Sequence, residues 1–415
     1  MSELHGTAFV PGCVSGILRA GADHADEHSI VMLTQQHIAE LDTRPAGFVI
    51  VDGAMLSHSM IRLLTLGIPG IMVSNEDADR LEPGREAFID GHQGIIIQPP
   101  PSNRPATPVP EPPAIGEAIS LEDGSEVRLH ASIFGIENVL QANKLGAAAI
   151  GLVRTEFLVP EQGGIPDADF YERTLSELVR TAHPLAVTLR LPDITPGKPA
   201  PWFKPKTGMT DILGLQGVRL YGEEPVKSVV NAMLEGINRL PGEHELRLLL
   251  PYVTRLDEFH YWRRKIQHRL TRMVPIGVMA ETPAAVLAMA HWFNEADFVA
   301  IGCNDLMQCL FAADRDLVEL SRYLDPYAPE LFNFLQQAAT AAGNNIDKVQ
   351  VCGLLPQIPG VLPVLLGMGF RVFSVAPVMI PYLANTVNVT DLAEAEALAH
   401  RVCSSRHSQQ VRDLL

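Results

Sequence analysis

Apolar runs of strand length alternate with amphipathic stretches along the second part of this chain. Alternation of this kind is typical of parallel strands joined by crossover helices, of which 136–146 and 283–293 are examples. Eight such units favour a (β/α)8 TIM barrel over a doubly wound sheet. The predicted strands lie at 127–135, 148–156, 185–193, 245–253, 275–282, 297–305, 349–355 and 370–377.

The first part of the chain predicts a smaller β/α domain. Ser57 is a good N-cap for an apolar-periodic helix over 58–66, and Gly67 followed by Pro69 ends that helix. Short β-branched runs flank the helix, and an Asp-Gly pair within 85–94 predicts a tight turn. The predicted strands are 48–53, 68–74 and 93–98.

A proline-rich stretch divides the two parts. Residues 99–114 read PPPSNRPATPVPEPPA, a composition that cannot form a helix or a central strand and behaves as an extended, semi-rigid spacer. We therefore predict an α/β protein with a first domain at 1–98, a linker at 99–114 and a barrel at 115–415.

Composition and charge narrow the class of protein. The net charge is −16, which makes the chain a poor nucleic-acid binder because the phosphate backbone demands a basic surface. No apolar run of about 18 residues lacks charge or proline, and the N-terminus lacks a signal-peptide pattern, so we expect no membrane span or membrane partner. The five scattered cysteines contain no CxxC pair, which argues against a disulfide framework or a zinc ribbon and favours a reducing cytoplasm.

Two of the predicted barrel strands end in a carboxylate. Glu281 closes the run VPIGVMAET, and Asp305 closes the run ADFVAIGCND. Because a barrel collects the C-terminal ends of its strands on one face, we expect both acids on that face. Two hard anionic ligands with room for water and substrate oxygens indicate a Mg²⁺ site, although two unrelated surface acids would give the same pattern.

Other predicted strands end near arginines or a thiol. Three arginines, a metal and a proton-donating thiol together suit a small phosphorylated acid as ligand. Each residue alone has a plainer interpretation, since an arginine after a strand is commonly solvated and a cysteine in VQVCG is commonly a small core residue. The candidate residues are Arg154, Glu156, Arg190, Asp193, Lys198, Asn304, Arg315 and Cys352.

His58 falls in the first turn of the helix predicted over 58–66. A phosphate on its imidazole would meet free backbone N–H groups and the positive end of the helix dipole. His58 is also one of 14 histidines and could stand at a helix start by chance. His92 and His130 have no such context, so we expect them to be structural.

Seven segments spread over nearly the whole chain carry the motifs of one known family in its order. They are DGAMLSHSMIRLLTLGIPGIMV, GAAAIGLVRTEFLV, LRLPDITPGK, VMAETPAAV, FVAIGCNDLMQCLFAADRD, VCGLLPQIPG and GMGFRVFSVAP. With these segments the chain resembles the phosphoenolpyruvate (PEP)-utilising enzymes, most closely enzyme I of the bacterial phosphotransferase system. Pyruvate phosphate dikinase and PEP synthase are relatives in the same family.

The resemblance implies an activity and roles for individual residues. It implies Mg²⁺-dependent phosphoryl transfer from PEP to His58 with release of pyruvate, as a swivelling first domain reaches the barrel. It also implies that Glu281 and Asp305 bind Mg²⁺ and that Cys352 protonates the enolpyruvate carbon. A homodimer is expected, because related barrels pair through this domain. The residues implied to contact PEP are Arg154, Arg190, Arg219, Asn304 and Arg315.

The chain departs from the family pattern close to these residues. The family segment LGWRGIRL is LGLQGVRL here, so Gln216 stands where an arginine that contacts phosphate is expected. The usual CGE ends in Leu354, which removes an acid that supports the thiol, and Leu56 removes the TSH hydroxyl beside the nucleophile. Cys303 replaces the threonine of GTND. Losing one charge-assisted contact to phosphate costs about 2–4 kcal/mol of transition-state binding.

Two domains of the relatives are not found in this sequence. Residues 16–33 run straight through the place where enzyme I carries its helical carrier-docking domain, and the ATP-grasp domain of the dikinases is not found either. A phosphohistidine at His58 would therefore need another protein, acting in trans, or a small molecule as its acceptor. Two other functions stay open: a PEP-binding regulatory protein without turnover, which Gln216 and Leu354 motivate, and a lyase that stabilises an enolate of a 2-oxo acid.

Overall fold

The protein is described by a computed structural model that covers residues 2–22, 25–40, 44–101, 107–195, 200–204, 214–242 and 244–415. By its internal contacts the chain divides into two compact units. The first comprises 1–111 and 314–323, and the second comprises 112–313 and 324–415. The segment 314–323, which lies within the predicted range 115–415, thus groups with the first unit. Lys198 lies outside the described residues.

A mixed β-sheet forms the centre of the first unit. Its strands are β1 (Ser2–His5), β2 (Thr7–Val10), β3 (Cys13–Ala20), β4 (Ser29–Thr34), β5 (Gly47–Val51), β6 (Gly70–Val73), β7 (Glu86–Asp90) and β8 (Ile95–Gln98). Within the described residues their order is β1-β8-β7-β3-β4-β5-β6-β2. The run from β3 to β6 is parallel, and the other neighbours are antiparallel. Buried aliphatic side chains such as Leu18, Ile30 and Val49 make its core.

Helix α1 (His58–Leu66) begins and ends where the sequence predicts. The Ser57 hydroxyl oxygen accepts the N–H of Met60 at 3.4 Å, and Gly67 adopts a left-handed conformation with φ 66°. Met60 and Leu64 lie on its buried face. The shorter helices of this unit are η1 (Gln35–Glu40), α2 (Asn75–Ala78) and η4 (Val318–Tyr323).

The described part of the proline-rich stretch 99–114 contains no helix or strand, as predicted. Thr107 anchors this stretch to the first unit, because its hydroxyl donates to the Asp90 carboxylate at 2.6 Å. The predicted domain boundaries at 98/99 and 114/115 stay predictions.

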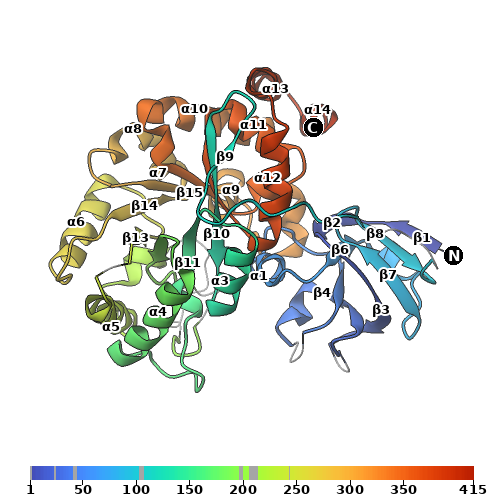
Figure 1. Ribbon diagram of the computed structural model, residues 1–415, viewed down its shortest axis with the longest axis horizontal. Helices are drawn as coiled ribbons and strands as arrows, with labels where there is room; N and C mark the ends of the chain where they lie inside the picture. Colours follow the sequence, from blue (N-terminus) through green and yellow to red (C-terminus); the bar gives the residue numbers. More distant parts are fainter. Residues whose placement is uncertain are drawn as a thin grey trace. The chain divides into compact units, whose positions relative to one another are not determined.

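The second unit is a closed parallel barrel (Figure 1), which confirms the predicted fold class. Its strands are β10 (Glu126–Ile133), β11 (Ala149–Arg154), β12 (Val187–Arg190), β13 (Leu246–Leu250), β14 (Ile276–Ala280), β15 (Val299–Gly302), β16 (Val349–Cys352) and β17 (Val372–Val375). Each pairs in parallel with the next, and β10 closes the ring by pairing with both β17 and β11. The short strand β9 (Ile119–Ser120) adds an antiparallel edge to β10. All eight predicted barrel strands are therefore confirmed.

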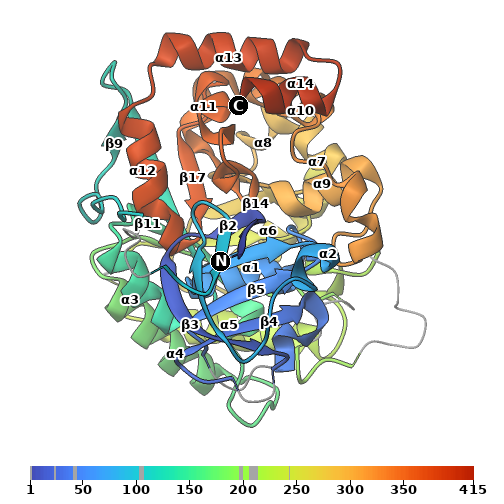
Figure 2. The same cartoon turned by 90° about the vertical axis from the view of Figure 1, so that its right-hand side faces the viewer.

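Helices surround the barrel because their apolar faces cover the strands. In α4, for example, Tyr171, Leu175 and Leu178 are buried. Helix α13 lies beside α10 and α11, and α14 packs against α13 (Figures 1 and 2). No helix in the described ranges is both long and apolar enough to cross a membrane. The helices are α3 (Ile136–Lys144), α4 (Ala168–Ala182), α5 (Val226–Arg239), α6 (Leu256–Gln267), α7 (Pro283–Leu287), α8 (Met289–Trp292), α9 (Cys303–Phe311), α10 (Pro329–Ala342), α11 (Val361–Gly367), α12 (Ile380–Asn388), α13 (Leu392–Ser404) and α14 (Ser408–Leu414).

The barrel interior has an apolar layer and a polar layer. Leu152, Leu249 and Met279 belong to the apolar layer, and the Cys352 thiol packs with them. In the polar layer His130 Nδ1 lies 2.7 Å from Gln350 Oε1. Burial lowers the pKa of His130 to about 4, so the imidazole is neutral at neutral pH.

We predict that His130 lowers the free energy of unfolding as the pH falls from about 6.5 to about 4. In this window the unfolded chain takes up a proton that the folded chain does not, and the excess of protons on the unfolded chain favours unfolding. Urea unfolding at about pH 7 and about pH 4.5 should show a larger loss for wild type than for His130→Asn. The exposed His28, replaced by Asn, controls for the loss of an imidazole. Equal losses in wild type and His130→Asn would contradict the prediction.

Candidate functional site

The candidate residues fall into two groups, one in each unit. His58 and Arg315 lie in the first unit. Seven lie in the second unit, at or after the C-terminal ends of barrel strands or in the loops that follow them: Arg154, Arg190, Arg219, Glu281, Asn304, Asp305 and Cys352.

Arg190, the last residue of β12, is buried among carboxylates. Its guanidinium pairs with Glu156 and lies 3.2 Å from Asp193 Oδ2. Burial disfavours the charged form, but Glu156, Asp193, Glu281 and Asp305 outweigh it and raise the pKa of Arg190. Arg190 therefore stays charged, and the acids around it outnumber it. Within the described part of this end of the barrel, these acids give an excess of negative charge that a bound cation would offset.

Glu281 directly follows β14 and is 1% exposed. Its Oε1 accepts the backbone N–H of Tyr252 at 2.6 Å, whereas its Oε2 is buried and has no hydrogen-bond partner among the residues that the structure describes. Burial, with Asp305 and Asp193 nearby, raises the pKa of this carboxyl group, against the opposing effect of Arg190. An unpartnered buried carboxylate oxygen is costly unless a ligand completes it.

The surroundings of Glu281 fit a hard divalent cation. Gly302 gives the carboxylate its room, since a Cβ there would lie 2.7 Å from Glu281 Oε2. Asp305 is partly exposed and stands in the first turn of α9. No group of three His, Cys, Asp or Glu side chains in the described part of the chain could enclose a metal. A cation held by Glu281 and Asp305 would therefore take its remaining oxygen ligands from water or substrate, as Mg²⁺ commonly does.

Asn304 is held by the loop that follows β16. Its side-chain oxygen accepts the backbone N–H of Leu354 at 3.0 Å. Gly353 has φ 101°, and a Cβ there would lie 2.7 Å from that same oxygen, so only glycine allows this approach. Because the oxygen is used in this way, the amide N–H₂ of Asn304 is the end that can donate to a ligand.

Cys352 ends β16 and is 1% exposed. Burial raises the pKa of its thiol to about 12, so the sulfur keeps its proton at neutral pH and can act as an acid. All five cysteines are free thiols.

Arg154, at the end of β11, stacks over the ring of Phe134 at 5.2 Å.

Arg219 contacts neighbours other than the carboxylates that surround Arg190. It donates to the Gly214 carbonyl at 3.0 Å, lies 3.6 Å from Glu258 Oε1, and stacks over the Tyr252 ring at 5.4 Å. Gln216 is buried just before the short helix η3 (Gly217–Leu220). The structure therefore gives Arg219 a partner of opposite charge, Glu258.

In the first unit, the ring of His58 is held at both nitrogens. Asp316 Oδ2 lies 2.7 Å from His58 Nδ1, and Asp316 Oδ1 accepts the His58 backbone N–H at 3.0 Å. Arg315 Nη2 lies 2.6 Å from His58 Nε2, and its Nη1 donates to the Leu56 carbonyl at 3.3 Å. A guanidinium can only donate, so Nε2 must be the acceptor and Nδ1 carries the proton shared with Asp316. In this tautomer the lone pair lies on Nε2, where it accepts the N–H of Arg315.

Asp316 was not predicted from the sequence, and Arg315 was expected with the barrel strand ends. Arg315 instead groups with His58, because it belongs to the segment 314–323 that packs in the first unit. Asp316 is separated from His58 by 258 positions, so no local pattern could pair them. The only signal was its place beside Arg315 in the run ADRD.

We predict that Glu281→Gln weakens Mn²⁺ binding, measured by electron paramagnetic resonance, by at least about tenfold, since it removes one anionic ligand. Gly302→Ala should weaken binding in the same direction, because its Cβ displaces the carboxylate. Gly164→Ala is the matched control, since a Cβ there meets nothing within 4 Å. Unchanged affinity in Glu281→Gln would show that the cation does not use this acid.

Comparisons with known proteins match both units of the chain. A family model described as "PEP-utilising enzyme, PEP-binding domain" matches residues 116–391, and one described as "PEP-utilising enzyme, mobile domain" matches residues 30–94. The phosphoenolpyruvate-protein phosphotransferase of Haloferax volcanii is 29% identical, over 94% of this chain and 72% of its own length. Those of Borreliella burgdorferi and Streptomyces coelicolor are 27% and 28% identical, each over 96% of this chain and 74% and 73% of their lengths.

Proposed function

This chain belongs to the PEP-utilising enzymes, and we propose that it transfers the phosphoryl group of PEP to Nε2 of His58 and releases pyruvate. The observation that carries the proposal is the double contact of the His58 ring. Asp316 holds the proton on Nδ1, which makes Nε2 the nucleophilic nitrogen. The Nε2 lone pair accepts an N–H of Arg315, so this contact must break before Nε2 attacks phosphorus, and the guanidinium can then turn to the phosphate oxygens. His58 also lies within the residues matched by the mobile-domain model.

The second unit supplies the proposed binding site for PEP. The family model for a PEP-binding domain matches residues 116–391. Arginines of this unit, together with Asn304, would hold the phosphate and carboxylate oxygens of PEP. A bound Mg²⁺ on Glu281 and Asp305 would offset the charge of the transferring group. The arginines of the second unit proposed to bind PEP are Arg154, Arg190 and Arg219. Arg315, which lies beside His58 in the first unit, is proposed to contact the phosphate during its transfer to that histidine.

The proposed reaction balances in two steps. The Nε2 lone pair of His58 forms the bond to phosphorus while the bond from phosphorus to the enol oxygen breaks, which leaves the enolate of pyruvate. Cys352 then gives its S–H proton to carbon 3 of that enolate, and the enolate electrons restore the ketone. The resulting thiolate recovers a proton from water after pyruvate leaves.

The onward acceptor of the phosphate is proposed to be another protein or a small molecule. A homodimer is the proposed assembly, since closed two-fold pairs are the commonest oligomers. A reducing cytoplasm is the proposed compartment, and five free thiols support it.

A PEP-binding regulatory protein is the second candidate function. Two observations favour it: Gln216 stands where an arginine is expected, and Arg219, which could substitute, pairs with Glu258. The contacts of His58 with Asp316 and Arg315 favour phosphoryl transfer over both this candidate and a lyase, because a relic histidine needs no such placement.

We predict that wild type gains one acid-labile phosphate per chain after incubation with PEP and Mg²⁺, with a matching amount of pyruvate. Intact-mass spectrometry at neutral to alkaline pH measures the gain. His58→Ala should gain none, whereas replacement of the exposed His92 by Ala should leave the gain intact. Bound PEP without phosphate gain or pyruvate would favour the regulatory candidate instead.

We predict that Asp316→Asn slows phosphorylation of His58 by about 10- to 100-fold. The amide can donate to Nδ1 and so permits the tautomer that protonates Nε2, which removes the nucleophilic lone pair. Rapid quench with mass detection measures the rate, and Asp79→Asn, at an exposed acid of the same unit, is the control. A rate equal to that of wild type would mean that Asp316 does not set the tautomer.

A further inference from the structure

Gln350 joins a histidine to the thiol of Cys352 inside the barrel. The two residues stand two apart on β16 and so point to the same side of the sheet. Gln350 Oε1 lies 2.7 Å from His130 Nδ1, and its Nε2 lies 3.1 Å from both the Gly151 carbonyl oxygen and Cys352 Sγ. The amide therefore bridges β10, β11 and the end of β16.

These partners settle which way the amide faces. The Gly151 carbonyl can only accept, so the atom facing it must be the N–H₂ group. The oxygen then faces His130, whose Nδ1 must carry the proton. One N–H of Gln350 goes to Gly151, and the other points at the sulfur.

Gly151 makes room for this arrangement. A Cβ at this position would lie 2.6 Å from His130 Cβ and 2.7 Å from Gln350 Oε1. With a side chain at 151, the histidine and the amide could not stand where they do. The close packing of all three residues fixes the amide in one orientation.

From this geometry we infer that Gln350 is a positioning residue for Cys352. Held in place by His130, its amide fixes the position of Cys352 Sγ and stabilises the thiolate that forms when Cys352 gives its proton to the enolate. The inference rests on the proposed function for its catalytic meaning. In that step the S–H bond breaks, the C–H bond at carbon 3 forms, and negative charge passes from the enolate to sulfur. A hydrogen bond to an ionised acceptor is stronger than one to a neutral acceptor, so the Gln350 contact strengthens as the proton leaves.

The proposed role of Gln350 fits the absence, at position 354, of the acid that supports the thiol in the family pattern. The acid that follows the family's cysteine is Leu354 here, and its side chain is apolar and buried. Arg154 and Arg190 favour a thiolate at Cys352, while Glu281 and burial oppose it. Gln350 adds a direct donor that does not depend on these distant charges.

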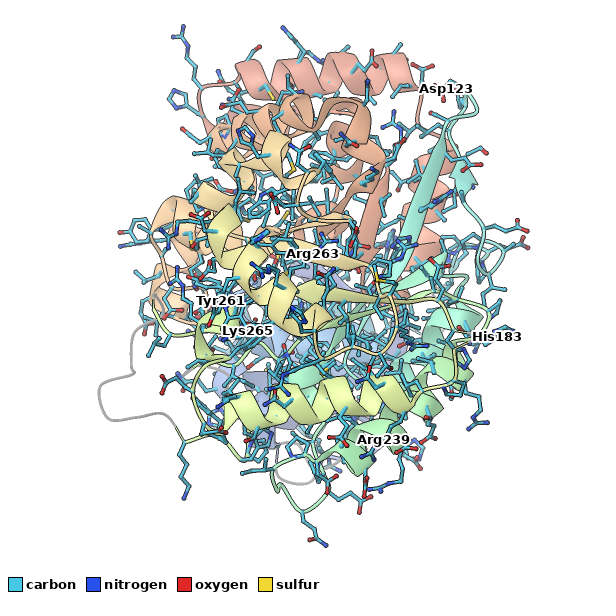
Figure 3. All side chains as sticks on the ribbon, turned by 90° about the vertical axis from the view of Figure 1, so that its left-hand side faces the viewer. Asp123, His183, Arg239, Tyr261, Arg263 and Lys265 are labelled. Atoms are coloured by element: carbon cyan, nitrogen blue, oxygen red, sulfur yellow. The ribbon has the colours of Figure 1, made fainter. Side chains whose placement is uncertain are left out.

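The other end of this polar layer opens to a cavity of about 870 Å³. His130, Gln350 and Thr188 line it, as does Asp297, which pairs at 3.0 Å with Arg263, labelled on α6 in Figure 3. Thr188 therefore shares the cavity with Gln350, but none of the hydrogen bonds between described residues joins it to Cys352. That makes Thr188 the matched control position.

The test is the rate at which iodoacetamide alkylates Cys352 at about pH 9 without PEP, read by peptide mass spectrometry against Cys403 of the same chain. Gln350→Met should slow the relative rate about tenfold, since the thiolate loses a charge-assisted hydrogen bond. Gln350→Glu, which keeps the shape but replaces the donor with an anion, should slow it at least as much. Thr188→Val should match wild type.

The direction in which the alkylation rate of Cys352 changes distinguishes the loss of a positioning hydrogen bond from a general loosening of the barrel packing. A loosened barrel would expose Cys352 and speed its alkylation, so an unchanged or faster rate in both Gln350 variants overturns the inference. Because this experiment uses no PEP, its failure leaves the phosphotransfer proposal standing. In turnover, Gln350→Met should keep the phosphate gain on His58 and slow deuterium exchange into the pyruvate methyl group about tenfold. Loss of both together would also overturn the inference.

Discussion

A buried guanidinium among carboxylates is the interaction on which the second unit's site depends. Removing one partner of such a pair typically costs about 3–5 kcal/mol, because the other charge is left buried and uncompensated. Arg190 pairs with Glu156 and Asp193, and its charge also opposes the rise in the pKa of Glu281. Within the described ranges, the acids still outnumber Arg190, and Glu281 Oε2 has no hydrogen-bond partner. Among the described residues, this arrangement leaves a buried carboxylate oxygen that a bound cation would complete.

Both units contain a polar contact near a residue where the family pattern is lost. Leu56 lacks the hydroxyl expected beside the nucleophile, and Asp316 contacts the His58 ring instead. Leu354 lacks an acid near the thiol, and Gln350 donates to that sulfur. In each case the contact comes from a different position along the chain. When a polar group is missing from a motif, a residue elsewhere in the chain can therefore supply a polar contact to the same side chain.

Local features of this chain were predictable, and contacts between distant residues were not. The caps of α1 follow from Ser57 and Gly67, and the barrel strands follow from apolar runs, because both depend on neighbouring residues. Strand ends also pointed to Glu281 and Asp305. By contrast, the Asp316 contact depends on how the segment 314–323 folds back, and the Gln350 contact depends on what faces it across the barrel. Neither leaves a periodic trace in the sequence.

The segment 314–323 alters how the first unit is attached. The chain passes between the units after 111, after 313 and after 323, so three covalent connections join them where a simple linker would make one. A rotation of the first unit must carry this segment along or separate it from His58. Since Asp316 is on the segment, separation would free the Nδ1 proton and change the tautomer preference of the ring. The placement of the proton on this ring therefore depends on whether the segment 314–323 stays packed beside His58.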